Sequence, residues 1–432
     1  MRAYKDSGIE WLGEIPEHWE VVKGSFLFFN KKELNSNFQC KTRLALTLNG
    51  VIEKDIEQNF GLNPLDFRTY QIFNYDDLVF KLIDLDNINT SRVGYVYKEG
   101  IMSSAYIRLT PNKKSYSKYF YYYYYSLYVK RVFNNIGTGV RSTLNVDELL
   151  SIKIPLPPIE EQKAIADFLD SKCKLIETFI EKKQKLITLL NEKKQALINE
   201  CVTKGLDKNV NFKDSGIEHL GAIPTHWEIK KLKMLFSFGN GLNITKADFV
   251  SYGVPCVSYG EIHSKYSCRL DLSIHTLPFV SETYLADKPQ SLLQKGDFVF
   301  ADTSEDIEGS GNFTSIQSDM PIFAGYHTIT LKPKANRIHS PYFSFLFDSN
   351  FTRNQIRKEV CGVKVFSITK AILKEIQCII PPLQEQKQIA EFLDSEISKI
   401  DSIIEKIKKQ IELIKEYKST LINQAVCGRI NL

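Results

Sequence analysis

The chain has 432 residues, of which 43% are hydrophobic and 25% charged, with a net charge of +5. This composition excludes a disordered chain, a collagen-like protein and a small disulfide scaffold, and the length allows two or three domains. No apolar run approaches the roughly 18 residues that span a bilayer, and no signal-peptide core is present, so we expect a cytoplasmic protein without a membrane partner. The eight cysteines form no Cys-x-x-Cys pair, so neither a metal site nor a redox dithiol is predicted. The mild positive charge permits nucleic-acid binding without indicating it.

The first element along the chain is a head segment that occurs twice. Residues 5–28 recur as residues 213–236, with 16 of 24 positions identical. The pairs His18-Trp19 and His226-Trp227 fall within these heads, where packing or partner docking explains them better than catalysis. The repeat predicts two modules of common origin.

Each head is followed by a middle region that reads as sheet-rich. Strand-like runs occupy residues 77–80, 94–97 and 105–109 in the first middle, and 297–300 and 327–331 in the second. A run of tyrosines at 116–128 could stack on bases, but its apolar counterpart at 341–347 favours a helix packed on the sheet. Little identity survives between the middles. We infer that the ends do one task twice while the middles face two different ligands; simple drift of duplicated modules is the alternative.

The third element is a tail that also occurs twice and reads as a long helix. PPIEEQKAIADFLDS begins at Pro157 and PPLQEQKQIAEFLDS at Pro381, each with acidic residues in the first turn, and Gly205 and Gly428 mark the ends. Apolar residues at steps of three and four form a coiled-coil seam, interrupted at Lys183. Pairing within the chain is the simplest reading, and a homo-oligomeric coiled coil is the alternative. The seam comprises Ile176, Ile180, Ile187, Leu190 and Leu197 in the first tail, and Ile397, Ile400, Ile404, Ile407, Ile411, Ile414 and Leu421 in the second.

Chain reach predicts that the two tails run antiparallel. A helix over residues 159–202 spans about 66 Å, whereas the link from 205 to 213 covers about 25–30 Å at most. The second module must therefore start near the end of the first helix, and its own helix must return. The predicted fold class is α+β, with two mixed sheet and helix domains joined by two long antiparallel coiled-coil helices in a pseudo-twofold internal repeat. The expected boundaries are 1–155, 156–205, 206–379 and 380–432.

Polar loops of the middles are the candidates for contacting a ligand such as DNA. The stretch 136–143 combines glycines that permit close backbone approach with hydroxyls and an arginine that can pair with phosphate or a guanine edge. The stretch 360–367 holds the matching place in the second half. For any one residue, solvated surface is about as good an explanation. The candidate residues are Lys81, Arg92, Thr138, Arg141, Ser142, Thr143, Tyr259, Glu261, His263, Lys265, Thr303, Lys364 and Ser367.

Catalytic signatures are weak throughout the chain. There is no Gly-x-x-x-x-Gly-Lys-Ser/Thr motif for nucleotide hydrolysis. Glu161-x-Lys163 and Glu385-x-Lys387 match half of a nuclease motif, but each lies in the first turn of a predicted helix, where the helix terminus explains the acid. No His-x-x-x-His pair is present. The sequence therefore predicts a binding protein with no catalytic and no metal-ligating residues.

The doubled KDSGIE-x-LG-x-IP-x-HW head and PP-x-x-EQK-x-IA-x-FLD tail carry a family resemblance. They resemble the DNA-specificity (S) subunit of type I restriction-modification enzymes, and the resemblance covers nearly the whole chain. It implies two target recognition domains, each recognising one half of a split, asymmetric sequence in double-stranded DNA. It also implies that the conserved helices set the number of unread base pairs between the halves.

Partners and cofactors follow from the same resemblance. Two modification subunits would dock on the repeated heads and helices and methylate adenine with S-adenosylmethionine, and restriction subunits would translocate and cut DNA with ATP and magnesium. No cofactor is expected in this chain. The alternative is a coiled-coil scaffold without sequence-specific DNA binding, which would leave two unlike polar modules unexplained.

Overall fold

The computed structural model describes residues 3–54, 66–86, 91–136, 143–218, 220–266, 268–334, 337–360, 362 and 365–432. The chain divides into two compact units, one made of residues 1–184 with 408–432 and the other of residues 185–407. Each unit holds one sheet-rich module and the first part of the long helix that follows this module in the chain. It also holds the last part of the other long helix. The first unit is therefore assembled from both ends of the chain.

The first module contains two four-stranded sheets, ordered β6-β5-β10-β7 and β4-β11-β8-β9. Two small antiparallel pairs, β1 with β2 and β12 with β3, connect the head to the rest. Its strands are β1 (Tyr4–Asp6), β2 (Glu14–Pro16), β3 (Glu20–Lys23), β4 (Phe28–Phe29), β5 (Arg43–Thr47), β6 (Gly50–Lys54), β7 (Gln71–Phe73), β8 (Leu78–Phe80), β9 (Val93–Tyr95), β10 (Gly100–Met102), β11 (Ile107–Pro111) and β12 (Lys153–Leu156). Its helices are α1 (Ser117–Val129), α2 (Val132–Ile136) and α3 (Val146–Ser151).

The second module has a five-stranded sheet, β16-β25-β21-β23-β18, and a four-stranded sheet, β19-β17-β24-β20. Its strands are β13 (Phe212–Asp214), β14 (Ala222–Pro224), β15 (Glu228–Lys231), β16 (Phe236–Asn240), β17 (Val254–Val257), β18 (Cys268–Leu270), β19 (Phe279–Val280), β20 (Leu292–Leu293), β21 (Phe298–Ala301), β22 (Thr303–Ser304), β23 (Phe313–Ile316), β24 (Ile322–Ala324), β25 (Thr328–Pro333), β26 (Phe366–Ser367) and β27 (Gln377–Ile380). Its helices are α5 (Leu232–Leu235), α6 (Tyr259–Ser264), α7 (Tyr284–Asp287), α8 (Ser340–Asp348), α9 (Asn350–Glu359) and α10 (Lys370–Glu375). Each of the five strand-like runs predicted from the sequence overlaps a strand.

The tyrosine run forms helix α1, and its rings pack inside the first module, as predicted. Tyr119, Tyr123 and Tyr124 are fully buried. The apolar counterpart forms α8, whose Tyr342 is equally buried. The hydroxyl of Tyr119 donates to the carbonyl of Val426 at 3.0 Å, and that of Tyr342 donates to the carbonyl of Val202 at 3.3 Å. Each module is therefore fastened to the last turn of the long helix that begins at the other module.

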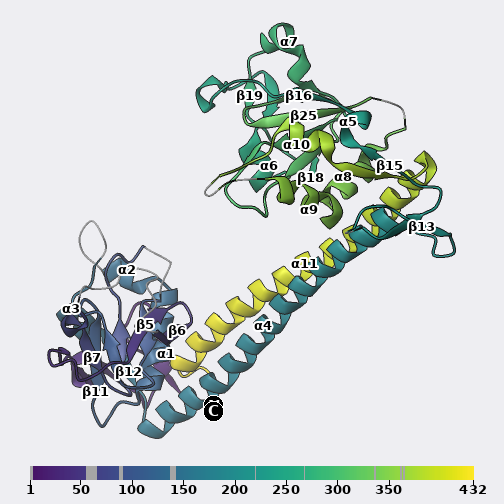
Figure 1. Ribbon diagram of the computed structural model, residues 1–432. Coiled ribbons are helices and arrows are strands. Elements are labelled where there is room, and N and C mark those ends of the chain that lie inside the picture. The colour runs from purple at the N-terminus through teal and green to yellow at the C-terminus, as the bar shows by residue number, and fades with distance from the viewer. Residues whose placement is uncertain are drawn as a thin grey trace. The chain divides into compact units, whose positions relative to one another are not determined.

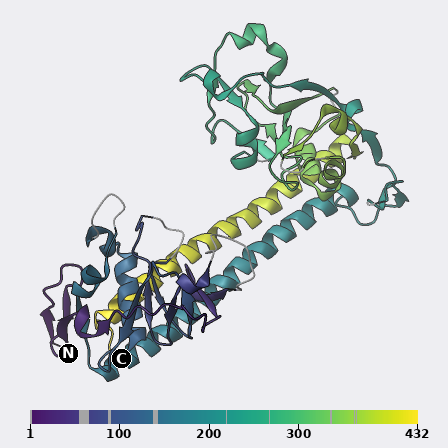
Figure 2. The same cartoon turned by 60° about the vertical axis from the view of Figure 1, so that its left-hand side comes forward.

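Two long helices, α4 (Ile159–Lys204) and α11 (Leu383–Val426), carry the predicted seam (Figure 1, Figure 2). In the first unit Lys418 pairs with Glu177 at 2.7 Å, and in the second unit Lys194 pairs with Asp401 at 2.9 Å. Moving forward along α4 therefore means moving back along α11, so the helices are antiparallel. Lys183, which interrupts the seam, lies over the ring of Phe179. The buried seam residues are Ile176, Ile397, Ile400, Ile404, Ile407, Ile411 and Leu421, and those that are half-buried are Ile180, Ile187, Leu190, Leu197 and Ile414.

A buried glutamine fixes the start of each long helix to its module. Gln162 donates to the carbonyl of Pro157 at 2.8 Å and accepts from the amide of Tyr116 at 2.8 Å. Gln386 makes the same two bonds in the second unit, to the carbonyl of Pro381 and from the amide of His339. Because these bonds satisfy backbone groups at a buried helix start, they set where each helix leaves its module.

Candidate nucleic-acid interface

A loop with the same backbone bonds occurs in both modules. In the first, the amide of Lys81 donates to the carbonyl of Arg92 at 3.0 Å; in the second, the amide of Ala301 donates to the carbonyl of Asn312 at 3.0 Å. A later segment of the chain then closes each loop, through a bond from the amide of Leu144 to the carbonyl of Leu82 and one from the amide of Ile368 to the carbonyl of Asp302. We call this shared set of backbone hydrogen bonds the loop frame. Lys81 in the first module corresponds in it to Ala301 in the second, and Arg92 corresponds to Asn312.

Both loops follow a strand that is directly preceded by a buried aspartate, which the sequence interpretation did not single out. Asp77 accepts from Arg108 Nε at 2.6 Å and from the Thr110 hydroxyl at 2.7 Å, and its counterpart Asp297 accepts from the amide of Gln294 at 3.0 Å. Burial raises the pKa of both carboxyl groups, and the hydrogen bonds act in the opposite direction. The repeated Asp-x-Val-Phe pattern was the available signal for these residues.

The described DNA-contact candidates of the first module lie close together at this loop, but their side chains differ in exposure. Lys81 and Thr143 are half-buried, whereas Arg92 is only 1% exposed. The Arg92 guanidinium donates to the carbonyls of Lys81, Ile83 and Asp84. Arg92 is therefore placed to hold the loop in shape. Thr138, Arg141 and Ser142 lie outside the described residues.

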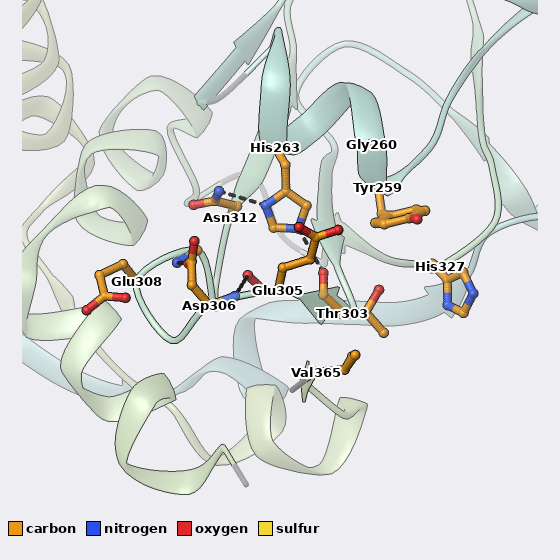
Figure 3. A pocket seen from close by; sticks show the side chains of 12 residues that line it. Tyr259, Gly260, His263, Thr303, Glu305, Asp306, Glu308, Asn312, His327 and Val365 are labelled. Carbon is orange, nitrogen blue, oxygen red and sulfur yellow. Dashed lines mark hydrogen bonds between the residues drawn. The ribbon is translucent and has the colours of Figure 1, made fainter. Parts of the chain in front are cut away.

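Three candidates of the second module line one cavity of about 770 Å³. Tyr259 and His263 come from α6, and Thr303 comes from β22 (Figure 3). Ser367, from β26, is the strand partner of Thr303. The other described candidates do not line this cavity: Glu261 accepts from the amide of Ser258 at 3.1 Å and caps α6, and Lys265 is exposed just past its end. Lys364 lies outside the described residues.

His263 is held by a chain of hydrogen bonds that fixes the wall of this cavity. Its Nε2 lies 2.8 Å from the carbonyl oxygen of Thr303, which can only accept, so Nε2 donates. Its Nδ1 then accepts from the Asn312 amide nitrogen at 2.9 Å. Asn312 Oδ1 accepts in turn from Arg353, which pairs with Asp348. Both ring nitrogens of His263 are thereby occupied, in the neutral Nε2–H form.

The cavity also contains residues that sequence reasoning missed, namely Glu305, Asp306, Glu308, Asn312 and His327. The carboxylates come from the loop after β22, and Figure 3 shows them around the same hollow as Tyr259 and His263. Asp306 Oδ1 accepts from the amide of Gly309 at 2.6 Å and so shapes the loop. The run Glu-Asp-Ile-Glu-Gly between two strands was the signal for this loop.

Among the residues that the structure describes, no three His, Cys, Asp or Glu side chains gather as ligands for a metal ion. Likewise, no helix among those residues is long and apolar enough to cross a membrane.

The chain was compared with known protein families. The family described as the type I restriction modification DNA specificity domain matches it twice, over residues 24–189 and 224–413. The chain belongs to this family. Its function class is accordingly DNA sequence specificity within type I restriction-modification systems, and catalysis is carried by other subunits of such systems.

Specificity subunits are also among its relatives, over the full length in one case and over about half of the chain in another. The MjaVIII specificity subunit of Methanocaldococcus jannaschii is 28% identical over 452 aligned residues, which cover 100% of this chain and 98% of the relative. The EcoKI specificity subunit of Escherichia coli K12 is 24% identical over 216 residues, or 49% of this chain. The resemblance inferred from the repeated heads and tails is confirmed.

Solved structures of this family share the fold. A chain from a study of complex assembly and conformational transition of the type I R-M system has a TM-score of 0.73 at 13% identity, covering 96% of this chain and 99% of its own. The HsdS subunit from Thermoanaerobacter tengcongensis has a TM-score of 0.52 at 14% identity, covering 96% and 98%. The predicted fold class, two recognition domains with two long helices in a repeat, is confirmed.

Proposed function

We propose that the first recognition domain of this specificity subunit contacts one half of a split DNA target and the second domain contacts the other half. The observation that carries the proposal is the shared loop frame with unlike side chains. Arg92 and Asn312 hold equivalent positions in the backbone hydrogen bonds of the two loops. Lys81 and Ala301 are equivalent to each other in the same way. A frame that is kept while its side chains differ suits two domains that bind two different base sequences.

We also propose which residues of each domain contact the DNA directly. In the first domain, Lys81 and Thr143 with Thr138, Arg141 and Ser142 are the proposed contacts, and Arg92 supports their loop. In the second, Tyr259, His263 and Thr303 at the cavity are the proposed contacts, together with Lys265, Lys364 and Ser367, while Glu261 acts by capping α6. A net charge of +5 is mild, so we expect weak, salt-sensitive DNA binding by the chain alone.

The partners of the chain are DNA and other subunits of a type I system. We propose two modification subunits, one at each copy of the repeated head and helix start, since those two surfaces are built by the same residues and bonds. Those subunits would supply S-adenosylmethionine chemistry on adenine, and restriction subunits would supply ATP- and magnesium-dependent cleavage. The complex would act on DNA in the cytoplasm.

Sequencing of N6-methyladenine in genomic DNA tests this function. Cells that carry the chain and its modification partner should show a split motif with adenine methylated on both strands, and deletion of this gene should abolish it. A motif that persists after deletion contradicts the proposal. An assembled complex with an intact cofactor site and no motif would instead favour the scaffold alternative.

A further inference from the structure

The cavity of the second recognition domain has the wrong charge for the phosphate backbone. Its described lining residues include Glu305, Asp306 and Glu308 and contain no lysine or arginine. Carboxylates repel phosphate groups, whereas they accept hydrogen bonds from amino groups on bases. A group that enters this cavity from DNA must therefore offer hydrogen-bond donors.

The side chains around the cavity divide into fixed walls and two exposed carboxylates, Glu305 and Glu308, which no hydrogen bond or ion pair engages within the described residues. Of these two, Glu305 lies beside His263 and Thr303, whereas Glu308 lies beyond Asp306 (Figure 3). His263 and Asn312 use their polar atoms on each other, on Thr303 and on Arg353. Asp306 is engaged by the amide of Gly309.

Two aromatic side chains line the same cavity as Glu305. The ring centroids of Tyr259 and His327 are 5.4 Å apart, and both residues line the cavity. His327 has a φ of 54°, a left-handed conformation that is costly for a residue with a Cβ. Its backbone carbonyl accepts from the amide of Asp302 at 3.1 Å, which holds it there. Strain of this kind is concentrated at binding sites, and here it occurs at a residue whose ring lines the cavity.

We propose that the cavity receives the major-groove edge of a base that carries an amino group, adenine or cytosine, and that Glu305 accepts the hydrogen bond from it. The proposal rests on the function proposed above and adds the chemistry of one position in one half-site. Adenine N6 and cytosine N4 are the amino groups that the major groove exposes, while guanine and thymine present acceptors there. The first domain has Arg92 at the place of Asn312, so this chemistry belongs to the second half-site.

The test compares methylation motifs in cells that carry the chain with its modification partner. Glu305→Ala should relax one adenine or cytosine position in one half-site and leave the other half-site unchanged. Asp319→Ala removes a carboxylate from the same domain, in an ion pair with Lys295 away from the cavity, and should leave the motif intact. An unchanged motif in Glu305→Ala, or relaxation at a guanine or thymine position, overturns the proposal.

A second measurement uses the assembled complex and covers the case in which Glu305→Ala gives no motif. Duplexes carry purine in place of adenine, or pyrimidin-2-one in place of cytosine, at each candidate position of the second half-site. The analogue that lacks the amino group bound by Glu305 should weaken binding about 5- to 150-fold. Whether the purine or the pyrimidin-2-one duplex shows this loss tells whether the bound base is adenine or cytosine. Equal binding of all analogues overturns the proposal while the split motif of the wild type still supports the general function. A wild type without a split motif overturns both.

Discussion

The indole nitrogen of Trp19 donates to the Glu161 carboxylate at 3.1 Å, in the first turn of α4. His18 Nε2 lies 2.6 Å from the other oxygen of the same carboxylate. The second unit repeats the arrangement, with Trp227 and His226 on Glu385 at 2.9 and 2.7 Å. The repeated His-Trp pairs therefore pack each head onto its own helix, which is one of the two explanations that the sequence left open.

Loss of this carboxylate should destabilise the first unit. Trp19 is 0% exposed, so Glu161→Ala leaves its N–H buried without an acceptor, at a cost of about 1–3 kcal/mol in the free energy of unfolding. The neighbouring Glu160 is exposed and, among the described residues, its carboxylate pairs with Lys163 alone, so Glu160→Ala should cost about 0–0.5 kcal/mol. Thermal unfolding of both variants measures the difference. Equal midpoints would show that the Trp19 bond contributes nothing.

The sequence located both partners of this contact without pairing them. The repeat identified His18-Trp19 as shared, and the helix pattern placed Glu161 in a first turn. However, 142 residues separate Trp19 from Glu161, and a helix terminus alone is sufficient reason for an acid. Periodicity predicts which face of an element is buried, as along the seam of α11, but it does not specify the partner of a polar group in the next element.

The seam allows a matched test on adjacent residues of α11. Ile404 is 6% exposed and Ile403 is 45% exposed. Ile404→Ala should lower the free energy of unfolding by about 2 kcal/mol or more, because it removes buried methyl groups and leaves a cavity. Ile403→Ala should change it by about 0.5 kcal/mol or less. Guanidinium denaturation followed by far-UV circular dichroism measures both, and similar losses would show that the buried face of α11 is not the stabilising one.

The candidate site was harder to predict than the fold, for a physical reason. Local composition predicts Tyr259, His263 and Thr303 as polar loop residues, whereas Tyr259 and His263 lie on α6 and Thr303 lies on β22. All three nevertheless meet at one cavity. The same reasoning selected Arg92, which is buried. Glu305 stands in the run Glu-Asp-Ile-Glu-Gly, whose composition is also that of ordinary solvated surface, so the sequence does not distinguish it. The exposure of a loop side chain depends on bonds such as those from Arg92 to three carbonyls, which no local pattern encodes.

Exchange of one middle region tests the division of labour between the domains. Replacing residues 30–150 with the same region of another specificity subunit should change one half of the methylated motif and leave the other half unchanged. A change in both halves would contradict separate recognition by the two domains.

Insertion into the first helix tests its role as a spacer. Four residues added near Thr188 lengthen α4 by about 6 Å, which corresponds to one or two base pairs at about 3.4 Å each. The methylated motif should gain unread positions between two unaltered halves. Alteration of either half-site, with the number of unread positions constant, would show that the helix does not set the spacing.

Acid should weaken the contact between α10 and the head of the second module. Hydrogen bonds from Lys231 and Lys233, both at 2.6 Å, lower the pKa of Glu375 to about 2. A carboxyl group with a lowered pKa stabilises the fold above its ordinary pKa, which is 4.5, and this contribution is lost as the pH falls through about 2. The unfolding temperature of the wild type should therefore fall from pH 4.5 to pH 2 more steeply than that of Glu375→Gln. Glu282→Gln, at an exposed glutamate without an ion pair in the described part of the module, should follow the wild type. Parallel curves for the wild type and Glu375→Gln would show that the two lysines do not stabilise the module through this carboxylate.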